Sequence, residues 1–510
     1  MKNIVYLSDK YKVTVCEKEE RKIDVFTALL ADGTMNNKKF PEAVYKKYDG
    51  LDIGTTSVKT YYTSFEFDES AVIEITLPQG TETISVKPQK YADKVEFVGN
   101  MVRISTNKAF KLYLEPNGDI FGGLHIFCNK KKAAENIKEH FISFEKGVYT
   151  TENCEYIKLN EYGMPIIDCI DSNTTVYIAQ EAVVNAAIIL NNVSNVKICG
   201  NGVISLIDRC HGAEENFTDV RYWGAFRKNA VPNIYIRNNC RDIEICDVLL
   251  NCEFRGVVIR NSKNVLLDNV KIFASSVNAD GINCVNTSEL VVNDCYIHSA
   301  DDCFCMYDSC DSIPWLNDGD CEKPTGICEN TEVRNCVMSS NARPFVLGGH
   351  ATGSKNPRNL IQNIYIHDCE IISTPYMLDD STVEDSKYWS GLMRILSQSE
   401  QLVKNITFEN IVFNVTKGHK GKAVHIEVRE NGNASYTEGQ GYRIEDIRFK
   451  NIKIQGNTKN MISSLIKGRS TNTDGSGVSN VLFDNVVIGD KKISSDNVIC
   501  EGCVSDVKFI

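Results

Sequence analysis

The sequence predicts an all-β protein in which a small N-terminal β-sandwich precedes a right-handed parallel β-helix. Two patterns carry this prediction. Before residue 130, apolar and polar residues alternate with a period of two in short runs, as in strands that bury one face. From about residue 140 onward, a motif of two short strands returns at intervals of 22 to 25 residues, which is typical of a repeat architecture. We expect the β-sandwich to occupy residues 1–132 and the β-helix residues 133–510.

The N-terminal runs are separated by Asp, Gly and Asn, which favour turns. We expect strands over residues 65–67, 72–77, 83–86, 102–104 and 111–114. Short strands at this spacing are typical of a β-sandwich. The Asn-Lys-Lys-Lys segment at 129–132 marks the expected end of this domain.

The repeated motif is apolar-x-apolar, then two residues that often include Asn or Asp, then apolar-x-apolar. Clear copies begin at Val265, Leu290, Ile364, Ile406, Ile447 and Val481, and weaker copies at Val196, Ile243 and Thr331. The interval is too short for ankyrin repeats or propeller blades, and the regular Leu and Asn positions of a leucine-rich repeat are missing. A parallel β-helix fits best. The longer intervals after residue 331 indicate coils that carry longer excursions.

Asparagine recurs at the bend of the motif, at Asn269, Asn410, Asn451 and Asn485. Asparagine tolerates left-handed backbone, and its side chain forms hydrogen bonds with backbone and neighbours. We therefore expect these residues to form ladders from coil to coil.

The chain contains 20 cysteines. Its first ten residues are broken by charge too early for a signal peptide, so we expect a cytoplasmic chain with reduced thiols. Cys295, Cys336 and Cys369 share the repeat position of Val270, which predicts inward packing of small apolar thiols. The only CxxC pair, at Cys500 and Cys503, is too little for a zinc site. We expect no metal and no cofactor.

Composition excludes several classes of protein. The net charge is 56 − 67 = −11, with 42% hydrophobic and 24% charged residues, which argues against disorder. An acidic chain without a basic block disfavours nucleic acid and anionic membranes as partners. No apolar run approaches the length of a membrane span.

Three carboxylates stand one coil apart. Asp280 precedes Asp301 by 21 residues and Asp302 by 22, so we expect them on adjacent coils, close to one another. Like charges at that distance raise at least one pKa and cost stability. Hydrolysis of a glycosidic bond uses such a set, because one protonated carboxyl serves the leaving oxygen and an ionised one activates water. Capping of bends and calcium binding are the alternatives that these carboxylates leave open.

Two further elements follow the carboxylates in later coils. Paired glycines at Gly348 and Gly349 precede His350, and Arg394 ends a long excursion. Paired glycines let backbone approach a ligand closely. Trp315 and Trp389 lie in excursions between repeats, where aromatic faces commonly stack on sugar rings. Packing of the loops on the β-helix is an equal explanation for these tryptophans.

In this order and spacing, Asn278-x-Asp280, Asp301-Asp302, Gly349-His350 and Arg394-Ile395 resemble the polygalacturonase family of glycoside hydrolases. The related dextranase and isopullulanase family shares the Asp…Asp-Asp core. The first ~130 residues are similar to the immunoglobulin-like domain that precedes the β-helix in dextranase-type enzymes.

The resemblance implies a role for each matched residue. Asp301 would be the general acid, and Asp280 and Asp302 would hold and deprotonate the water, with inversion at the anomeric carbon. Asn278 would orient the carboxylates, and His350 would tune the acid. Substrate would be bound by Gly349 and Arg394, with Trp315 and Trp389 beside the cleft.

The sequence departs from the family pattern at two positions. Galacturonan enzymes typically carry Arg-Ile-Lys, in which the Lys pairs with a substrate carboxylate, whereas Leu396 stands here. Ala351 follows His350 where the family has Gly. A missing cation removes a charge-assisted bond of about 1.5–3 kcal/mol, which favours a neutral sugar. Arg343 is the nearest candidate for compensation.

We therefore expect an inverting glycoside hydrolase that acts on an oligo- or polysaccharide. The alternatives are a β-helix polysaccharide lyase or epimerase, and a non-catalytic carbohydrate-binding β-helix protein. A lyase needs a cation to neutralise a uronate and a strong base such as Lys, Arg or Tyr. The oligomeric state, the sugar and the linkage stay open.

Overall fold

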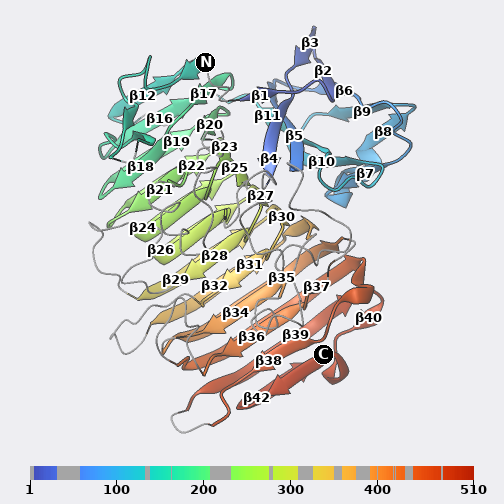
Figure 1. Ribbon diagram of the computed structural model, residues 1–510, viewed down its shortest axis with the longest axis vertical. Helices are drawn as coiled ribbons and strands as arrows, with labels where there is room; N and C mark the ends of the chain where they lie inside the picture. The colour runs from blue at the N-terminus through green and yellow to red at the C-terminus, as the bar shows by residue number, and fades with distance from the viewer. Residues whose placement is uncertain are drawn as a thin grey trace, which may run out of the picture.

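The computed structural model describes residues 5–30, 58–132, 138–161, 163–206, 231–274, 279–307, 326–349, 359–374, 391–398, 400–416, 419, 421–430, 440–471 and 475–510. These residues confirm the predicted fold class. A small sandwich of two sheets is followed by a right-handed parallel β-helix whose coils are stacked along the long axis of the molecule (Figure 1). Within the described residues, no helix is both long and apolar enough to cross a membrane.

The N-terminal sandwich contains two sheets in the described part of the chain. The first has the order β1-β4-β5-β11-β10-β7, and its β5 and β11 run parallel. Its strands are β1 (Tyr6–Leu7), β4 (Phe26–Leu30), β5 (Val58–Phe67), β7 (Ile84–Lys87), β10 (Phe110–Pro116) and β11 (Leu124–Lys130). The second is antiparallel throughout, in the order β3-β2-β6-β9-β8. Its strands are β2 (Lys12–Cys16), β3 (Glu20–Ile23), β6 (Ala71–Thr76), β8 (Val95–Val98) and β9 (Met101–Thr106), with the 3-10 helix η2 (Gln89–Lys94) nearby.

Period-two burial explains these strands. In β6 the residues alternate between buried and half-buried along its whole length, because successive side chains point to opposite faces of a sheet. The inward residues of both sheets form one apolar core that includes Val15, Ile73, Ile104 and Leu114. The boundary predicted at residues 132 and 133 falls between β11 and β12.

The β-helix has three faces, and each coil contributes a strand segment to each face. The first face contains β12 (His140–Phe144), β16 (Thr174–Ile178), β19 (Ser194–Cys199), β22 (Arg241–Cys246), the second halves of β24 (Val257–Asp268) and β26 (Ile282–Asn293), then β29 (Ile327–Arg334), β32 (Leu360–His367), β35 (Leu402–Val415), β37 (Arg443–Gly456), β39 (Gly477–Ile488) and β42 (Val504–Phe509). The second face contains β13 (Gly147–Tyr149), β17 (Ala182–Val184), β20 (Val203–Ser205), β23 (Leu249–Cys252), β25 (Lys271–Ala274), β27 (Tyr296–Ser299), β30 (Val337–Ser340), β33 (Glu370–Ser373) and the ends of β35, β37 and β39.

The third face carries the strands that follow the turns of greatest interest. It contains β15 (Pro165–Ile167), β18 (Ala187–Asn191), β21 (Ile234–Arg237), the first halves of β24 and β26, then β28 (Phe304–Tyr307), β31 (Phe345–Leu347), β34 (Met393–Ser397), β36 (Val424–Val428), β38 (Ser464–Lys467) and β41 (Val498–Glu501). Short additions are β14 (Lys158–Leu159), β40 (Lys491–Lys492), η6 (Thr458–Asn460) and η7 (Ser495–Asn497).

The register of the first face confirms the predicted repeat. The nine predicted start positions pair in succession down the stack: Val196, Ile243, Val265, Leu290, Thr331, Ile364, Ile406, Ile447 and Val481. The pairing is parallel and unshifted at each step, so the sequence repeat is the structural coil.

The asparagine ladder is also confirmed. Asn269, Asn410, Asn451 and Asn485 have φ values of 54°, 55°, 53° and 53°. Asn485 Nδ2 donates to Asn451 Oδ1 over 3.0 Å, and Asn451 Nδ2 donates to Asn410 Oδ1 over 3.1 Å. Each bend is therefore bonded to the bend of the preceding coil.

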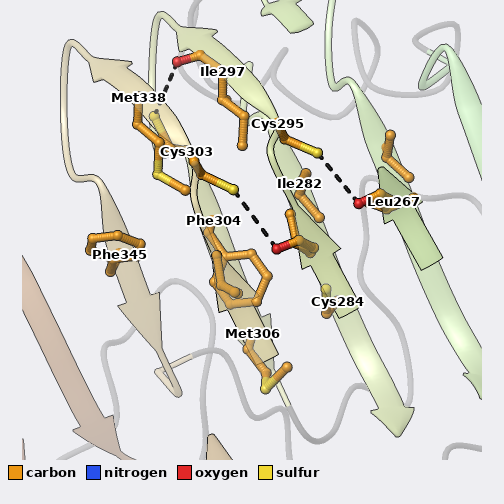
Figure 2. Close-up of a cluster of buried hydrophobic side chains, with 14 of the residues drawn as sticks. Leu267, Ile282, Cys284, Cys295, Ile297, Cys303, Phe304, Met306, Met338 and Phe345 are labelled. Carbon is orange, nitrogen blue, oxygen red and sulfur yellow. Dashed lines mark hydrogen bonds between the residues drawn. The ribbon is translucent and has the colours of Figure 1, made fainter. Parts of the chain in front are cut away.

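The interior is a single apolar column in which thiols replace aliphatic side chains. Cys295, Cys336 and Cys369 are buried in the same cluster as Val270, as predicted. Figure 2 shows Cys295 and Cys303 pointing into this interior beside Ile282 and Ile297. The Cys295 thiol donates to the backbone oxygen of Leu267 over 3.6 Å. Every cysteine that the structure describes is a free thiol.

Phenylalanines continue the column toward the C-terminus. Phe408, Phe449, Phe483 and Phe509 stack face to face, with ring centroids 5.4, 5.1 and 5.2 Å apart. These rings occupy one register position in four consecutive coils.

The sandwich packs against the outer surface of the second face (Figure 1). The buried apolar residues that meet there are Ala28, Tyr62, Tyr113 and Phe127 from the sandwich and Val203, Leu249, Phe273, Tyr296, Val337 and Ile372 from the β-helix. Ion pairs between Lys111 and Asp294 (2.7 Å) and between Lys132 and Asp247 (3.1 Å) lie at the edge of this contact.

Candidate active site

The predicted carboxylates lie together in the turns that join the second face to the third. Arg255, Asp280, Asp302 and Arg343 each stand two residues before a strand residue, and those strand residues pair in succession as Val257, Ile282, Phe304 and Phe345. The turns are bonded to one another as well, because Gly281 N donates to Asp302 O over 2.8 Å. Consecutive coils thus place four charged side chains in one column.

A glycine makes this close stacking of turns possible. A Cβ atom added at Gly281 would lie 2.4 Å from Ile297 Cγ2 and 2.7 Å from the backbone oxygen of Cys303. No side chain fits in that space. The Asp-Gly pair at 280–281 therefore serves the approach of adjacent turns as well as the chemistry of the carboxylate.

Asp280 is buried and paired with a cation. Its side chain lies 3.3 Å from Arg255 Nη2 and accepts a hydrogen bond from Asn283 Nδ2 over 2.8 Å. Burial raises the pKa of Asp280, the neighbouring Asp302 adds to this rise, and Arg255 and Asn283 oppose it. The result is a carboxylate with a pKa above its ordinary value, which is a stronger base than a solvated Asp.

Asp302 is held by Arg343. Its Oδ1 accepts from Arg343 Nε over 2.6 Å and from the backbone N–H of Arg343 over 3.1 Å. Its Oδ2 lies 3.6 Å from the thiol of Cys305. Carboxylate oxygens of Asp280 and Asp302 lie within 4.8 Å of each other, which is close enough for both to contact one small molecule.

Asp301 differs from the other two carboxyls in its exposure and its pairing. Its side chain is 20% exposed, and its Oδ1 is 3.4 Å from Arg343 Nη2. Its backbone oxygen accepts from Ser299 Oγ and from Ser340 Oγ, each over 2.7 Å. Burial, followed by the charges of Asp302 and Asp280, raises the pKa of Asp301 well above its ordinary value. This carboxyl can therefore keep a proton at a pH at which a solvated Asp has lost it.

The later motifs reach the same face of the β-helix. Arg394 lies in β34, in register with Val346, Cys305 and Asn283 of the preceding coils. It is 3% exposed, and burial together with the nearby Arg343 lowers its pKa well below the ordinary value. Gly349 has a φ of 103°, and a Cβ added there would lie 2.8 Å from Leu396 Cδ1. Leu396 is buried and packs against this glycine.

Four predicted site residues, Asn278, His350, Trp315 and Trp389, lie outside the described residues. The structure brings Asp280, Asp301, Asp302 and Arg343 together and places Arg394 on the same face. Arg343 was named as a substrate-binding residue, and the structure places it in ion pairs with two carboxylates. Its binding role stays a prediction.

Arg255 and Asn283 escaped the sequence analysis, although each binds Asp280. The signal was present in the repeat, because Arg255 lies 25 residues before Asp280 in the preceding coil. Asn283 lies three residues after Asp280 on the outward side of β26. Single polar residues at such positions carry no motif, so the register was needed to find them.

Asp280, Asp302 and Cys305 form the one group in the described residues whose ligand atoms are close enough to hold a metal ion. Two guanidinium groups already offset the charge of the two carboxylates. Burial raises the pKa of Cys305 well above its ordinary value, and metals bind the thiolate. The arrangement thus suits acid–base chemistry better than metal binding.

Comparison with known proteins bears on this column of charges. Residues 167–328 match the family model of glycosyl hydrolases family 28. The matched segment contains Asp280, Asp301 and Asp302, so the resemblance predicted from the motifs is confirmed there. The family 28 match supports a glycoside hydrolase.

Solved structures share the fold. Dex49A from Penicillium minioluteum is 14% identical with a TM-score of 0.58, over 96% of this chain and 91% of that chain. An endo-xylogalacturonan hydrolase from Aspergillus tubingensis is 16% identical with a TM-score of 0.44, over 72% and 92%. A polygalacturonase from Erwinia carotovora is 13% identical with a TM-score of 0.43, over 74% and 99%. Comparison with the curated proteins finds no match.

Proposed function

We propose that the chain is an inverting glycoside hydrolase in which Asp301 is the general acid and Asp280 and Asp302 activate water. One observation carries the proposal. Three carboxyl groups stand in adjacent turns, and their surroundings differ. Asp280 and Asp302 each contact a guanidinium group within 3.3 Å, whereas Asp301 lies at the longer distance of 3.4 Å from Arg343 and has a strongly raised pKa. Environments of this kind assign acid and base roles to carboxyls that are chemically alike.

The proposed reaction begins with a protonated Asp301 beside the glycosidic oxygen. Asp301 gives its proton to that oxygen as the bond to the anomeric carbon breaks. A water molecule held between Asp280 and Asp302 attacks the anomeric carbon from the opposite face and loses a proton to this pair. The product has the inverted configuration. The proton on the Asp280–Asp302 pair then returns to solvent, and Asp301 is protonated again.

The two arginines support the division of roles. Arg255 and Arg343 stabilise negative charge on Asp280 and Asp302, so those carboxylates can accept a proton. Without these cations, three acidic groups in one column would take up protons to relieve their repulsion. The guanidinium groups thus keep the base ionised while the acid stays protonated.

We propose a neutral sugar as the substrate. The position beside Arg394 that would carry a cation for a uronate carboxylate is Leu396, which is buried and packs on Gly349. An apolar side chain there offers no charge-assisted bond to a carboxylate. This supports a neutral oligo- or polysaccharide over galacturonan.

The test is a panel of galacturonan, dextran, pullulan and short neutral oligosaccharides, with release of reducing sugar as the measurement. On the substrate that is cleaved, Asp301→Asn should lower kcat by at least about 10²-fold, because general acid catalysis contributes roughly 10²–10⁴-fold. Asp506→Asn, on the last coil, is the matched control and should leave kcat unchanged.

Proton NMR of the first product formed would establish the anomeric outcome, and retention would contradict the proposed mechanism. A product that absorbs as an unsaturated uronide would identify a lyase instead. Wild-type turnover by Asp301→Asn would overturn the assignment of the acid. Preferred cleavage of galacturonan would overturn the proposal of a neutral sugar.

A further inference from the structure

The N-terminal sandwich contacts the strands that carry the proposed catalytic turns. Figure 1 shows β4, β5 and β11 of the sandwich beside β25 and β27 of the second face. β25 precedes the turn of Asp280, and β27 precedes the turn of Asp301 and Asp302. The sandwich therefore backs the two coils in which the three carboxyls stand.

A buried hydrogen-bond chain crosses this contact. Thr60 Oγ1 on β5 lies 2.8 Å from His125 Nε2 on β11, and His125 Nδ1 lies 2.5 Å from Tyr296 Oη on β27. None of the three side chains is more than marginally exposed to solvent. The ring of His125 also contacts His298 of β27, with ring centroids 5.1 Å apart.

Both nitrogens of His125 are used whichever one carries the proton. Burial, and the nearby His298, lower the pKa of His125 well below its ordinary value, so the imidazole is neutral and has one N–H. Thr60 and Tyr296 each have a hydroxyl that donates or accepts. One tautomer donates to Tyr296 and accepts from Thr60, and the other does the reverse. The chain is satisfied in either direction, and it is broken if any of its three members loses its polar atom.

β27 connects this chain to the proposed acid over a short distance. Tyr296 is the first residue of β27, and Ser299 is the last. Ser299 Oγ donates to the backbone oxygen of Asp301 over 2.7 Å. A shift of β27 relative to β30 would therefore move Asp301 relative to Arg343, which belongs to the next coil.

We propose that His125 of the N-terminal sandwich is a positioning residue for Asp301, acting through Tyr296 and β27. The sandwich is then part of the catalytic apparatus, because it holds the coil that carries the acid in register with its neighbours. This inference rests on the proposed function, since it gives Asp301 the role of general acid.

The first test is Tyr296→Phe, which keeps the ring in the contact and removes only the hydroxyl. We expect kcat to fall by about 10- to 100-fold, because small displacements of a catalytic group have effects of that size. KM should stay within about twofold, because His125 and Tyr296 are not placed at the substrate. Hydrogen exchange should accelerate at the backbone amides of residues 299–302.

A second pair of variants separates hydrogen bonding from packing. Thr60→Val keeps the shape and removes the hydroxyl, whereas Thr60→Ser keeps the hydroxyl and removes a methyl group. Thr60→Val should lower kcat and accelerate exchange at 299–302 in the same way, and Thr60→Ser should resemble the wild type. The control is Glu66→Ala, which removes a contact of the sandwich with Asn201 near β20 and should change neither measurement.

A folded Tyr296→Phe protein with wild-type kcat and unchanged exchange at 299–302 would overturn the inference. Equal losses in Thr60→Ser and Thr60→Val would also overturn it, because packing would then explain the effect. The exchange measurement needs no substrate. If Asp301→Asn retained full turnover, the proposed function would fail, and exchange would still decide whether His125 holds the turn of Asp301.

Discussion

Arg343 holds Asp302 with two nitrogens, since both its Nε (2.6 Å) and its backbone N (3.1 Å) donate to Oδ1 of that carboxylate. The remaining end of the guanidinium group reaches Asp301, with Nη2 at 3.4 Å from Oδ1. One planar group thus fixes the relative position of two carboxyls that differ in protonation. Lysine has a single charged nitrogen and cannot make this set of contacts.

Replacement of Arg343 should impair both activity and stability. We expect Arg343→Met to lower kcat/KM by at least about 10²-fold, because the proposed base loses its cation and its orientation. Removal of one partner from a buried ion pair costs roughly 3–5 kcal/mol of unfolding free energy. Arg343→Lys should recover stability better than activity. Initial rates and urea unfolding measure the two effects.

The control for this prediction is Arg334→Met, which removes a surface pair with Glu332. Its unfolding free energy should change by less than about 1 kcal/mol. An Arg343→Met protein as stable and active as this control would show that the buried pairs contribute little.

The raised pKa of Asp301 predicts the direction of the pH dependence. Activity should fall as the pH rises through the folded-state pKa of Asp301, because the acid then loses its proton. The alkaline limb of kcat/KM against pH should therefore lie well above the ordinary range of Asp. An alkaline limb near pH 4 would contradict the assignment of Asp301 as the acid.

The same shift predicts that Asp301→Asn stabilises the protein. A carboxyl whose folded pKa is raised stabilises the fold fully below its unfolded pKa, and this contribution is lost as the pH rises through the folded pKa. Asn carries no charge at any pH. The variant should therefore melt on the order of 1–2 °C above the wild type at pH 8, and the difference should vanish below about pH 3.9. Calorimetry at both pH values measures this, and a lower Tm for the variant at pH 8 would contradict it.

The bend at Asn451 allows strain and hydrogen bonding to be separated. Asn451→Gly keeps the left-handed backbone and loses the side-chain ladder, which should cost about 0.5–1.5 kcal/mol for each hydrogen bond. Asn451→Ala should cost about 1–2 kcal/mol more, because L-residues with a Cβ resist that conformation. Equal unfolding free energies for the two variants would show that the backbone at this bend is unstrained.

Thiol reactivity should follow burial. Among the thiols that the structure describes, Cys169 and Cys500 are exposed, whereas Cys305 and Cys336 are buried and have pKa values well above the ordinary range. Iodoacetamide should therefore label the first two in the native protein and the last two only after unfolding. Peptide mass spectrometry measures the labelling. Loss of activity that accompanies labelling of Cys305 would contradict the view that no thiol takes part in the reaction.

Most of the β-helix could be predicted because each coil repeats the same physical requirement. The start residues from Val196 to Val481 pair in the predicted order, since an apolar side chain at each of them must enter the same column. The proximity of Asp280 to Asp302 followed from the same period. A regular repeat turns separation in sequence into position in space, and this is why three carboxyls 21 and 22 residues apart could be placed together.

The contacts that cross between the two domains could not be predicted. His125 and Tyr296 lie 171 residues apart, and no period relates the sandwich to the coils. Arg255 was missed for a different reason, because a single arginine in a turn has no pattern of its own. It acquires a meaning only when the register sets it beside Asp280.

The parallel register that builds the β-helix leaves a free edge at its last coil. β42 pairs with β39 on one side, and any chain with the same period could in principle add to the other side. Its outward residues Ser505, Asp506 and Lys508 are exposed and mostly charged, and charged side chains are the means by which natural sheet edges resist further pairing. A protein made by adding one coil to the next must also prevent end-to-end polymerisation, and these residues of the last coil are placed to do so.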